Sequence, residues 1–277
     1  MNPDEYCQQK AVASGSSFYY SFLFLPQERR RAITALYAFC REVDDVVDEC
    51  SDAQLARTKL AWWRLEIGRL FEDKPTHPVT NALRPFTEIF QITAEHLNEI
   101  IDGMEMDLTQ TRYLDFAGLE RYCYCVAGAV GLLAAGIFGY RNPRTLNYAT
   151  NLGTAFQLTN IIRDVGEDAR KNRIYLPMDE LKRFKVPASD ILQAKHSESF
   201  RKLMEFQARR AESYYDKAMQ SLPAEDRRTQ RAGLIMAAIY RATLAEVERD
   251  GFRVLAQRTS LTPVRKFWLA WKTWLSA

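Results

Sequence analysis

Apolar residues recur at steps of three and four residues along almost the whole chain, which is the spacing of one face of an α-helix. No sustained alternation of apolar and polar residues, the pattern of a half-buried strand, interrupts this spacing. Proline-, glycine- and asparagine-containing segments separate the helical patterns, which cover 28–49, 53–72, 94–108, 115–139, 143–168, 197–221 and 225–257. The 277 residues therefore predict an all-α fold, and one domain over 1–277 is its simplest organisation.

Composition narrows the class of protein. A hydrophobic fraction of 47% is enough for a sizeable core, and a net charge of +3 without a basic stripe argues against a nucleic-acid partner. The five cysteines are odd in number and show no C-x-x-C spacing, which favours a reducing, cytoplasmic setting. The N-terminal stretch MNPDEYCQQK is too polar for a signal peptide. The longest apolar run, VAGAVGLLAAGIFG, is shorter than the roughly 20 residues of a membrane-spanning helix, so a soluble protein is expected.

Two stretches place aspartates inside segments that otherwise look buried: FCREVDDVVDE at 39–49 and QLTNIIRDVGED at 157–168. At about 100° per residue, each stretch forms a narrow polar stripe on one helix face, flanked by valine, leucine and isoleucine. The stripes consist of Tyr37, Arg41, Asp44 and Asp48 on the first helix and of Gln157, Asn160, Asp164 and Asp168 on the second. One pair of aspartates four residues apart is usually a solvated surface, but two flanked stripes indicate a shared function.

Carboxylates crowded into a cleft repel one another. Two unit charges about 6 Å apart repel by roughly 3 kcal/mol at an effective dielectric constant of about 20. Neighbouring arginines offset part of this cost. A hard divalent cation offsets more, because Mg²⁺ prefers oxygen ligands and is commonly held by carboxylates together with substrate phosphates. The paired stripes therefore predict a magnesium site for a diphosphate substrate.

The stretches YAFCREVDDVVDE, YCYCVAGAVG and QLTNIIRDVGEDARKNRIYLP resemble the motifs of the squalene/phytoene synthase family, which condenses two isoprenyl diphosphates head to head. The resemblance extends from SGSSFYYSFLFLP at 14–26 to the region of Arg258, and it is strongest to the bacterial presqualene diphosphate synthases. It implies an isoprenoid-synthase helical bundle with a central cavity. In such a bundle the two aspartate helices face each other across the mouth of the cavity.

The resemblance also implies roles for individual residues. About two or three Mg²⁺ ions would be held by Asp44, Asp48, Asn160, Asp164 and Asp168. The four aspartates and Tyr122 are the expected catalytic residues, since a tyrosine can stabilise a carbocation and relay the proton lost as a cyclopropane closes. Substrate binding is expected at Ser14, Ser17, Phe18, Tyr37, Arg41, Gln157, Asn160, Arg163, Tyr175, Tyr240 and Arg258. Both Arg41 and Arg163 also fit the plainer role of ion-pair partner to a neighbouring aspartate.

The implied reaction joins two farnesyl diphosphates into presqualene diphosphate with release of diphosphate, a prenyl transfer in hopanoid and squalene biosynthesis. NADPH is not expected, and enzymes of the downstream squalene pathway are expected partners. Squalene synthase activity, with a second NADPH-dependent step, and phytoene or dehydrosqualene synthase activity are alternatives within the family. An inert membrane-associated helical scaffold is the alternative outside it, although intact aspartate stripes argue against this role. None of the three histidines follows a glutamate by three residues, which argues against a di-iron bundle.

The stretch LTPVRKFWLAWKTWL at 261–275 predicts an amphipathic helix over 262–275, with Thr262 as its N-cap and Pro263 in its first turn. Large apolar side chains, including three tryptophans, share one face, and the basic side chains lie opposite. Such a helix either packs on the bundle or lies at a membrane interface. We expect it to make a peripheral contact with the inner face of the cell membrane.

Small residues form another stripe within the apolar run, at Gly128, Gly131, Ala135 and Gly139. Small side chains let helix backbones approach closely, and they also leave a smooth groove for an isoprenoid chain. The groove interpretation predicts that Gly131→Leu weakens prenyl binding more than it weakens folding.

Overall fold

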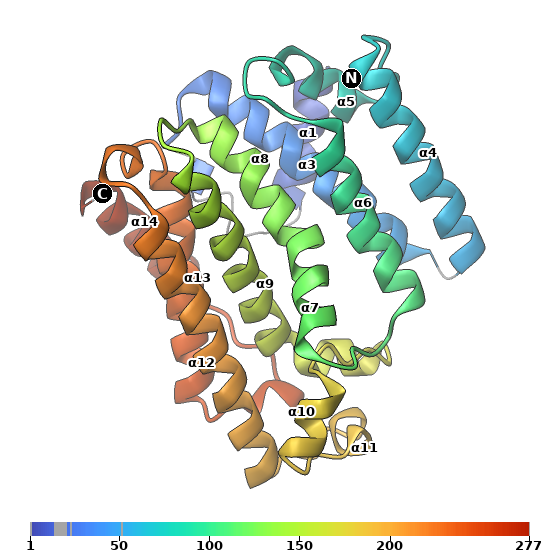
Figure 1. Cartoon of the computed structure of the whole chain (residues 1–277), viewed down its shortest axis with the longest axis vertical. Helices are drawn as coiled ribbons and strands as arrows, with labels where there is room; N and C mark the ends of the chain where they lie inside the picture. The colour runs from blue at the N-terminus through green and yellow to red at the C-terminus, as the bar shows by residue number, and fades with distance from the viewer. Residues whose placement is uncertain (1, 14–20, 23, 51, 277) are drawn as a thin grey trace.

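The computed structural model describes residues 2–13, 21, 22, 24–50 and 52–276, and its regular elements there are helices (Figure 1). They are, in chain order, α1 (Pro3–Ala13), α3 (Gln27–Glu49), α4 (Ala53–Phe71), α5 (Pro78–Leu83), α6 (Ala94–Thr109), α7 (Phe116–Cys123), α8 (Ala129–Phe138), α9 (Arg144–Arg170), α10 (Met178–Arg183), α11 (Ala188–Leu192), α12 (Glu198–Ser221), α13 (Arg231–Arg249) and α14 (Pro263–Ser276). One isolated bridge joins Arg112 and Ile174. The all-α prediction is confirmed.

Helix α9 runs through the middle of the bundle, with α7 and α8 along one side and α12 and α13 along the other (Figure 1). Helices α3 and α6 pack on the far side of α8, and α4 packs against both of them. Two clusters of buried apolar side chains result, one around α9, α12 and α13 and one around α3, α4, α6 and α8. The side chain of Val126 packs against both clusters. The turn between α7 and α8 therefore lies where the two halves of the core meet.

Side-chain caps begin several helices where the sequence offers them. Asp52 accepts hydrogen bonds from the first turn of α4, Thr93 from that of α6, Asp115 from that of α7 and Ser197 from that of α12. Each cap satisfies a backbone N–H that would otherwise lack a partner and stabilises its helix by about 1 kcal/mol.

The segment 225–257, expected to be one helix, is divided. A short 3₁₀ turn, η3 (Ala224–Asp226), precedes α13, and α13 ends before Gly251, whose φ of 68° is left-handed. A second 3₁₀ turn, η4 (Arg253–Leu255), follows. The apolar spacing continues through these turns because Val254 and Leu255 are buried against the core. The apolar spacing alone therefore does not reveal where helix α13 begins and ends.

The run from Phe116 to Phe138 is one continuous helical path, in which α7 and α8 are joined by a π-helical turn, η2 (Tyr124–Gly128). By length and composition this path is long and apolar enough to cross a membrane, which corrects the expectation that the apolar run is too short. Half of its most apolar window is buried in the bundle, where it packs between α6 and α9. A π-turn inserted in a helix often marks a functional site, and this one directly follows Tyr122 and Cys123.

Candidate active site

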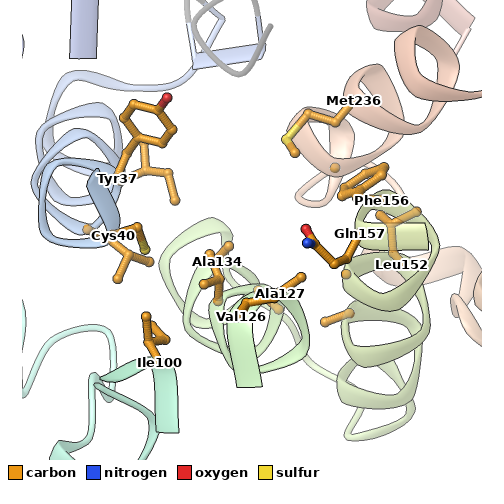
Figure 2. Close-up of a pocket in the computed structure, with 18 of the residues that line it drawn as sticks. Tyr37, Cys40, Ile100, Val126, Ala127, Ala134, Leu152, Phe156, Gln157 and Met236 are labelled. Carbon is orange, nitrogen blue, oxygen red and sulfur yellow. The ribbon is translucent and has the colours of Figure 1, made fainter. Parts of the chain in front are cut away.

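A cavity of about 250 Å³ lies among α3, α6, α8, α9 and α13 (Figure 2). On α9 its lining runs from Tyr148 to Asn160, roughly 18 Å at a rise of 1.5 Å per residue. Figure 2 shows Tyr37 of α3 and Gln157 of α9 on opposite walls, with Ala134 of α8 between them. Most of the lining is apolar, but Arg41, Asp44, Gln157 and Asn160 line it toward the C-terminal ends of α3 and α9. The shape suits a long hydrocarbon chain that carries a charged head.

The first aspartate stripe reaches this cavity through Arg41 and Asp44, which both line it. The neighbouring Val43 and Val47 are buried in the core and thereby fix which face of α3 turns toward the cavity. Arg41 donates a hydrogen bond to Asp44 and another, of 2.5 Å, to Asp45. In this structure Arg41 is therefore an ion-pair partner of the aspartates and lies at the edge of the cavity.

The second stripe lies on α9, where Gln157 and Asn160 line the cavity. Asn160 donates from Nδ2 to Gln157 Oε1 over 3.3 Å, whereas Asn160 Oδ1 is buried and has no hydrogen-bond partner among the described residues. One turn further along, Arg163 donates to Asp164 over 2.7 Å, and Arg258 donates to the same carboxylate over 2.8 Å. A buried acceptor without a donor is costly, so Asn160 Oδ1 is a position where a cation or a ligand donor would be stabilising.

The C-terminal ends of α3 and α9 lie side by side. Lys171, which follows α9, donates to Asp48 of α3 over 3.1 Å, and Arg173 contacts the same carboxylate at 3.5 Å. The two stripes are therefore brought to one end of the cavity, as the resemblance implies. Lys171 and Arg173 belong to the motif DARKNRIYLP, but no role was predicted for either residue from the sequence. A role for both could have been predicted, because they are basic residues that directly follow an acidic stripe.

Burial and mutual repulsion make two of the aspartates easier to protonate. Burial, together with the neighbouring carboxylates, raises the pKa of Asp44 to about 6 and that of Asp168 to about 7. Asp164 differs: burial favours a higher pKa, but the two arginines that bond to its carboxylate hold its pKa below the ordinary value. Negative charge at this end of the cavity is thus only partly balanced by the basic side chains of the protein.

Asp107 of α6 was not predicted from the sequence as a site residue. It lies near both stripes, since its charge contributes to the raised pKa of Asp44 and of Asp168. Its carboxylate accepts hydrogen bonds of 2.8 Å from Tyr122 and 2.7 Å from Tyr175. Burial raises the pKa of Asp107 although the two tyrosines oppose the shift, and burial raises the pKa of Tyr122 well above its ordinary value. Tyr122 therefore remains a protonated donor at neutral pH. Helical spacing could have identified Asp107 as a site residue, because it shares the buried face of α6 with Ile100 and Met104.

The remaining predicted residues have mixed positions. Tyr37 and Tyr122 line the cavity, whereas Tyr240 is buried in α13 with its ring centroid 4.7 Å from that of Phe156. Arg258 lies at the rim, with about half of its side chain exposed and bonded to Asp164. The expected loop residues Ser14, Ser17 and Phe18 lie outside the described residues, so their role stays a prediction.

The stripe of small residues serves helix packing as well as the cavity. Gly131 lines the cavity, but a Cβ atom there would lie 2.5 Å from the carbonyl oxygen of Ala149 on α9. The expectation that Gly131→Leu disturbs binding more than folding is therefore corrected, because the α9 backbone leaves no room for a side chain. Gly139 does not continue the stripe: it ends α8 with a φ of 85°.

The residues at the polar end fit a hard cation without forming a complete cage. Within the described part of the chain, no three carboxylate, imidazole or thiol groups converge closely enough to hold a metal by themselves. The unpartnered oxygen of Asn160 and the crowded carboxylates of Asp44 and Asp168 supply the neutral and anionic oxygens that Mg²⁺ prefers. Phosphate oxygens of a substrate would complete such a site.

Comparison with known proteins agrees with this arrangement. Residues 11–265 match the family model described as squalene/phytoene synthase. The chain is 34% identical over 275 residues to the phytoene synthase of Arthrospira platensis, a match that covers 95% of this chain and 89% of that one. It is also 34% identical over 270 residues to the chloroplastic phytoene synthase 1 of Arabidopsis thaliana, a longer protein of which the match covers 63%.

Two solved structures are similar over most of their length. A dehydrosqualene synthase, crystallised in complex with a ligand, superposes with a TM-score of 0.86 at 28% identity, covering 98% of this chain and 95% of that chain. The squalene synthase HpnC from Alicyclobacillus acidocaldarius superposes with a TM-score of 0.80 at 26% identity, covering 90% and 94%. Because the family model matches nearly the whole chain and the fold is shared, this chain belongs to the squalene/phytoene synthase family of prenyltransferases.

Proposed function

We propose that this protein condenses two farnesyl diphosphates head to head into presqualene diphosphate with release of diphosphate. The observation that carries the proposal is the apolar cavity whose one polar end is built from the stripes of α3 and α9. The motif resemblance to presqualene diphosphate synthases supports the choice of substrate. The structural neighbours named dehydrosqualene synthase and squalene synthase support it further, since both names denote products assembled from farnesyl units.

Divalent metal would be held by Asp44, Asp48, Asn160, Asp164 and Asp168, with diphosphate oxygens as further ligands. When bound, Mg²⁺ would neutralise the charge that develops on the departing diphosphate.

Basic side chains at the polar end are placed to exchange partners. Arg41, Arg163 and Arg258 now bond to aspartates, and Lys171 and Arg173 bond to Asp48. Diphosphate oxygens offer these guanidinium and ammonium groups equivalent charge-assisted hydrogen bonds. The same side chains would thus orient the diphosphates of the substrates while the allylic carbons point into the apolar chamber.

Proton removal is assigned to Tyr122 and Asp107. Cleavage of the C–O bond of one substrate gives an allylic cation, which alkylates a double bond of the second, and loss of a proton then closes the cyclopropane. Tyr122 is in the cavity wall and already donates to Asp107. Its oxygen would accept the proton as its own proton passes to Asp107, whose raised pKa favours receiving it.

The apolar walls would protect the cation from water. Phe156 and Leu152 of α9, Val126 of the π-turn and Met236 of α13 surround the chamber below the polar end (Figure 2). An allylic cation exposed to solvent would be converted to an alcohol, so exclusion of water is a requirement of this chemistry.

A second candidate, phytoene synthesis from two geranylgeranyl diphosphates, is favoured by the names of the curated relatives at 32–34% identity. The two candidates use the same residues and differ in the length of the prenyl chain. We therefore propose incubating the protein with farnesyl or geranylgeranyl diphosphate and Mg²⁺, with and without NADPH, and identifying the products by mass spectrometry. Presqualene diphosphate formed from farnesyl diphosphate regardless of NADPH supports the proposal. Conversion of geranylgeranyl diphosphate, but not farnesyl diphosphate, into phytoene supports the second candidate. Squalene formed from farnesyl diphosphate only in the presence of NADPH contradicts both candidates.

A further inference from the structure

Helix α14 presents a wide apolar face to solvent. Its exposed apolar side chains, between 37% and 79% accessible, are Val264, Phe267, Trp268, Trp271, Trp274 and Leu275. On a helix of about 100° per residue they occupy an arc of about 120°. These six belong to a set of fourteen exposed large apolar side chains in the described residues, so the exposure is concentrated on one helix. Concentrated apolar exposure marks an interaction surface.

The opposite, narrow side of α14 attaches it to the bundle. Ala270 is fully buried and, with Leu269 beside it, packs against Ile235 of α13. Arg265 donates to Glu246 of α13 over 2.6 Å. Attachment to the bundle therefore uses small and medium side chains together with Trp274, which packs on Phe24, and leaves Trp268 and Trp271 outside. The two alternatives raised from the sequence, attachment to the bundle and an outward contact, are compatible.

The surroundings of the apolar face are basic. From Gly251 to Ala277 the sequence has no aspartate or glutamate, and its basic residues are Arg253, Lys266 and Lys272 together with Arg258 and Arg265, which pair with Asp164 and Glu246. The Nζ atom of Lys272 lies 5.0 Å from the ring centroid of Trp268, at the border of the apolar face. Arg231 of α13 lies over the ring of Trp274 at 5.6 Å. Tryptophan beside lysine and arginine, with no acidic side chain on the helix, is typical of a helix that lies in the headgroup region of an anionic bilayer.

We propose that α14 is a membrane-docking helix, which inserts Trp268 and Trp271 into a bilayer containing anionic lipids and places Lys272 at the level of the lipid phosphates. The proposal does not depend on the reaction assigned above. A protein partner for this face would need an acidic, apolar surface of its own. A bilayer with anionic headgroups supplies both the charge and the apolar layer.

The docking face adjoins the cavity. Trp274 stacks on Phe24 with ring centroids 5.7 Å apart, and Phe22, two residues earlier, lines the cavity. Lys266, on the bundle side of α14, is close enough to Arg163 and Arg258 that burial and these charges lower its pKa. A bilayer bound at α14 would thus lie beside the apolar chamber, and a hydrophobic chain would have a short path between the two.

The test is flotation of the 277-residue chain with vesicles of phosphatidylcholine alone or phosphatidylcholine mixed with phosphatidylglycerol. The wild type should float with the anionic vesicles. Trp268→Ser/Trp271→Ser should reduce the partition coefficient of the protein onto the vesicles by about tenfold or more, because two inserted rings are lost. Lys272→Ala should reduce binding to the anionic vesicles by about fivefold and leave binding to neutral vesicles unchanged.

A matched control is Leu65→Ser/Phe71→Ser, which removes two exposed apolar side chains of α4, 63% and 43% accessible, far from α14 in sequence. This variant should bind like the wild type. Circular dichroism melting of each variant shows whether it is folded. The proposal is overturned if the wild type does not float with either vesicle, if the tryptophan variant binds like the wild type, or if the control loses as much binding. Self-association through α14 without vesicle binding, seen by light scattering, would overturn it as well.

Discussion

Replacing Tyr122 with phenylalanine tests whether its hydroxyl moves a proton or only fills space. Tyr122 donates to Asp107 over 2.8 Å, and only 9% of Asp107 is exposed. Loss of a hydrogen bond to a buried charged acceptor costs about 1.5–3 kcal/mol of folding free energy. If the hydroxyl also relays the proton, the turnover rate falls by about 100- to 10,000-fold, the usual contribution of general acid–base catalysis.

Tyr175→Phe is the matched control for this variant. Tyr175 donates to the same carboxylate over 2.7 Å, but its side chain is not part of the cavity lining. We expect a similar loss of stability and a smaller loss of turnover rate, about 10- to 100-fold, as for residues that only orient a functional group. The double variant Tyr122→Phe/Asp107→Asn should turn over about as slowly as Tyr122→Phe alone, since the two residues act as one unit.

The assay is product formation in a single turnover with prenyl diphosphate, together with urea denaturation of each variant. The substrate dissociation constant should change little, because the hydroxyl is needed after binding. The relay is refuted if Tyr122→Phe keeps a turnover rate within a few-fold of the wild type. It is also refuted if Tyr175→Phe is slowed equally, because the tyrosines would then act only by holding the carboxylate in place.

Two further predictions concern folding. Gly131→Ala should destabilise the protein by about 1–3 kcal/mol, because the added Cβ would meet the carbonyl oxygen of Ala149. Gly68→Ala, whose Cβ would meet no described atom within 4 Å, should stabilise the protein by about 0.5–1 kcal/mol. Urea denaturation measures both changes in the free energy of unfolding, and equal effects would contradict the close approach at Gly131. Glu66 is fully buried, and although burial favours a higher pKa, its hydrogen bonds to two threonines and two backbone amides lower the pKa to about 2. The unfolded chain protonates this carboxyl first, so its stabilisation is present above about pH 4.5 and is lost as the pH falls toward 2. Glu66→Gln should therefore cost about 2 kcal/mol at neutral pH and progressively less in acid, and a pH-independent difference in urea denaturation would contradict this reasoning.

Much of the fold follows from local pattern. The structure begins α3 at Gln27 and ends it at Glu49, and α4 covers Ala53–Phe71, both within a residue of the predicted segments. These helices have strong apolar spacing, and Asp52 marks the boundary between them by capping α4. The same reasoning placed the aspartate stripes on the correct faces, because a narrow polar stripe among buried valines leaves few orientations open.

Features that depend on contacts between distant segments were not predictable in this way. The π-turn at Tyr124–Gly128 leaves no mark on the apolar spacing, and it lies where Val126 packs against both halves of the core. Asp107 gains its role only when Tyr122 and Tyr175, fifteen and sixty-eight residues away, approach it. Helix α13 ends at Arg249 because Gly251 adopts a left-handed conformation. The apolar spacing of the sequence continues past Gly251 and so gives no sign of this end.

A metal–diphosphate site shared by α3 and α9 can be tested by calorimetric binding of a non-hydrolysable prenyl thiodiphosphate, with and without Mg²⁺, to the wild type and to Asp44→Asn and Asp168→Asn. These substitutions lie on α3 and α9 respectively, at the two carboxylates that burial and their acidic neighbours make easiest to protonate. We predict that Mg²⁺ strengthens binding to the wild type and that either substitution alone removes this Mg²⁺-dependent gain while the helical content is unchanged. Binding that is indifferent to Mg²⁺, or a gain that survives substitution on one of the two helices, would contradict a shared metal–diphosphate site.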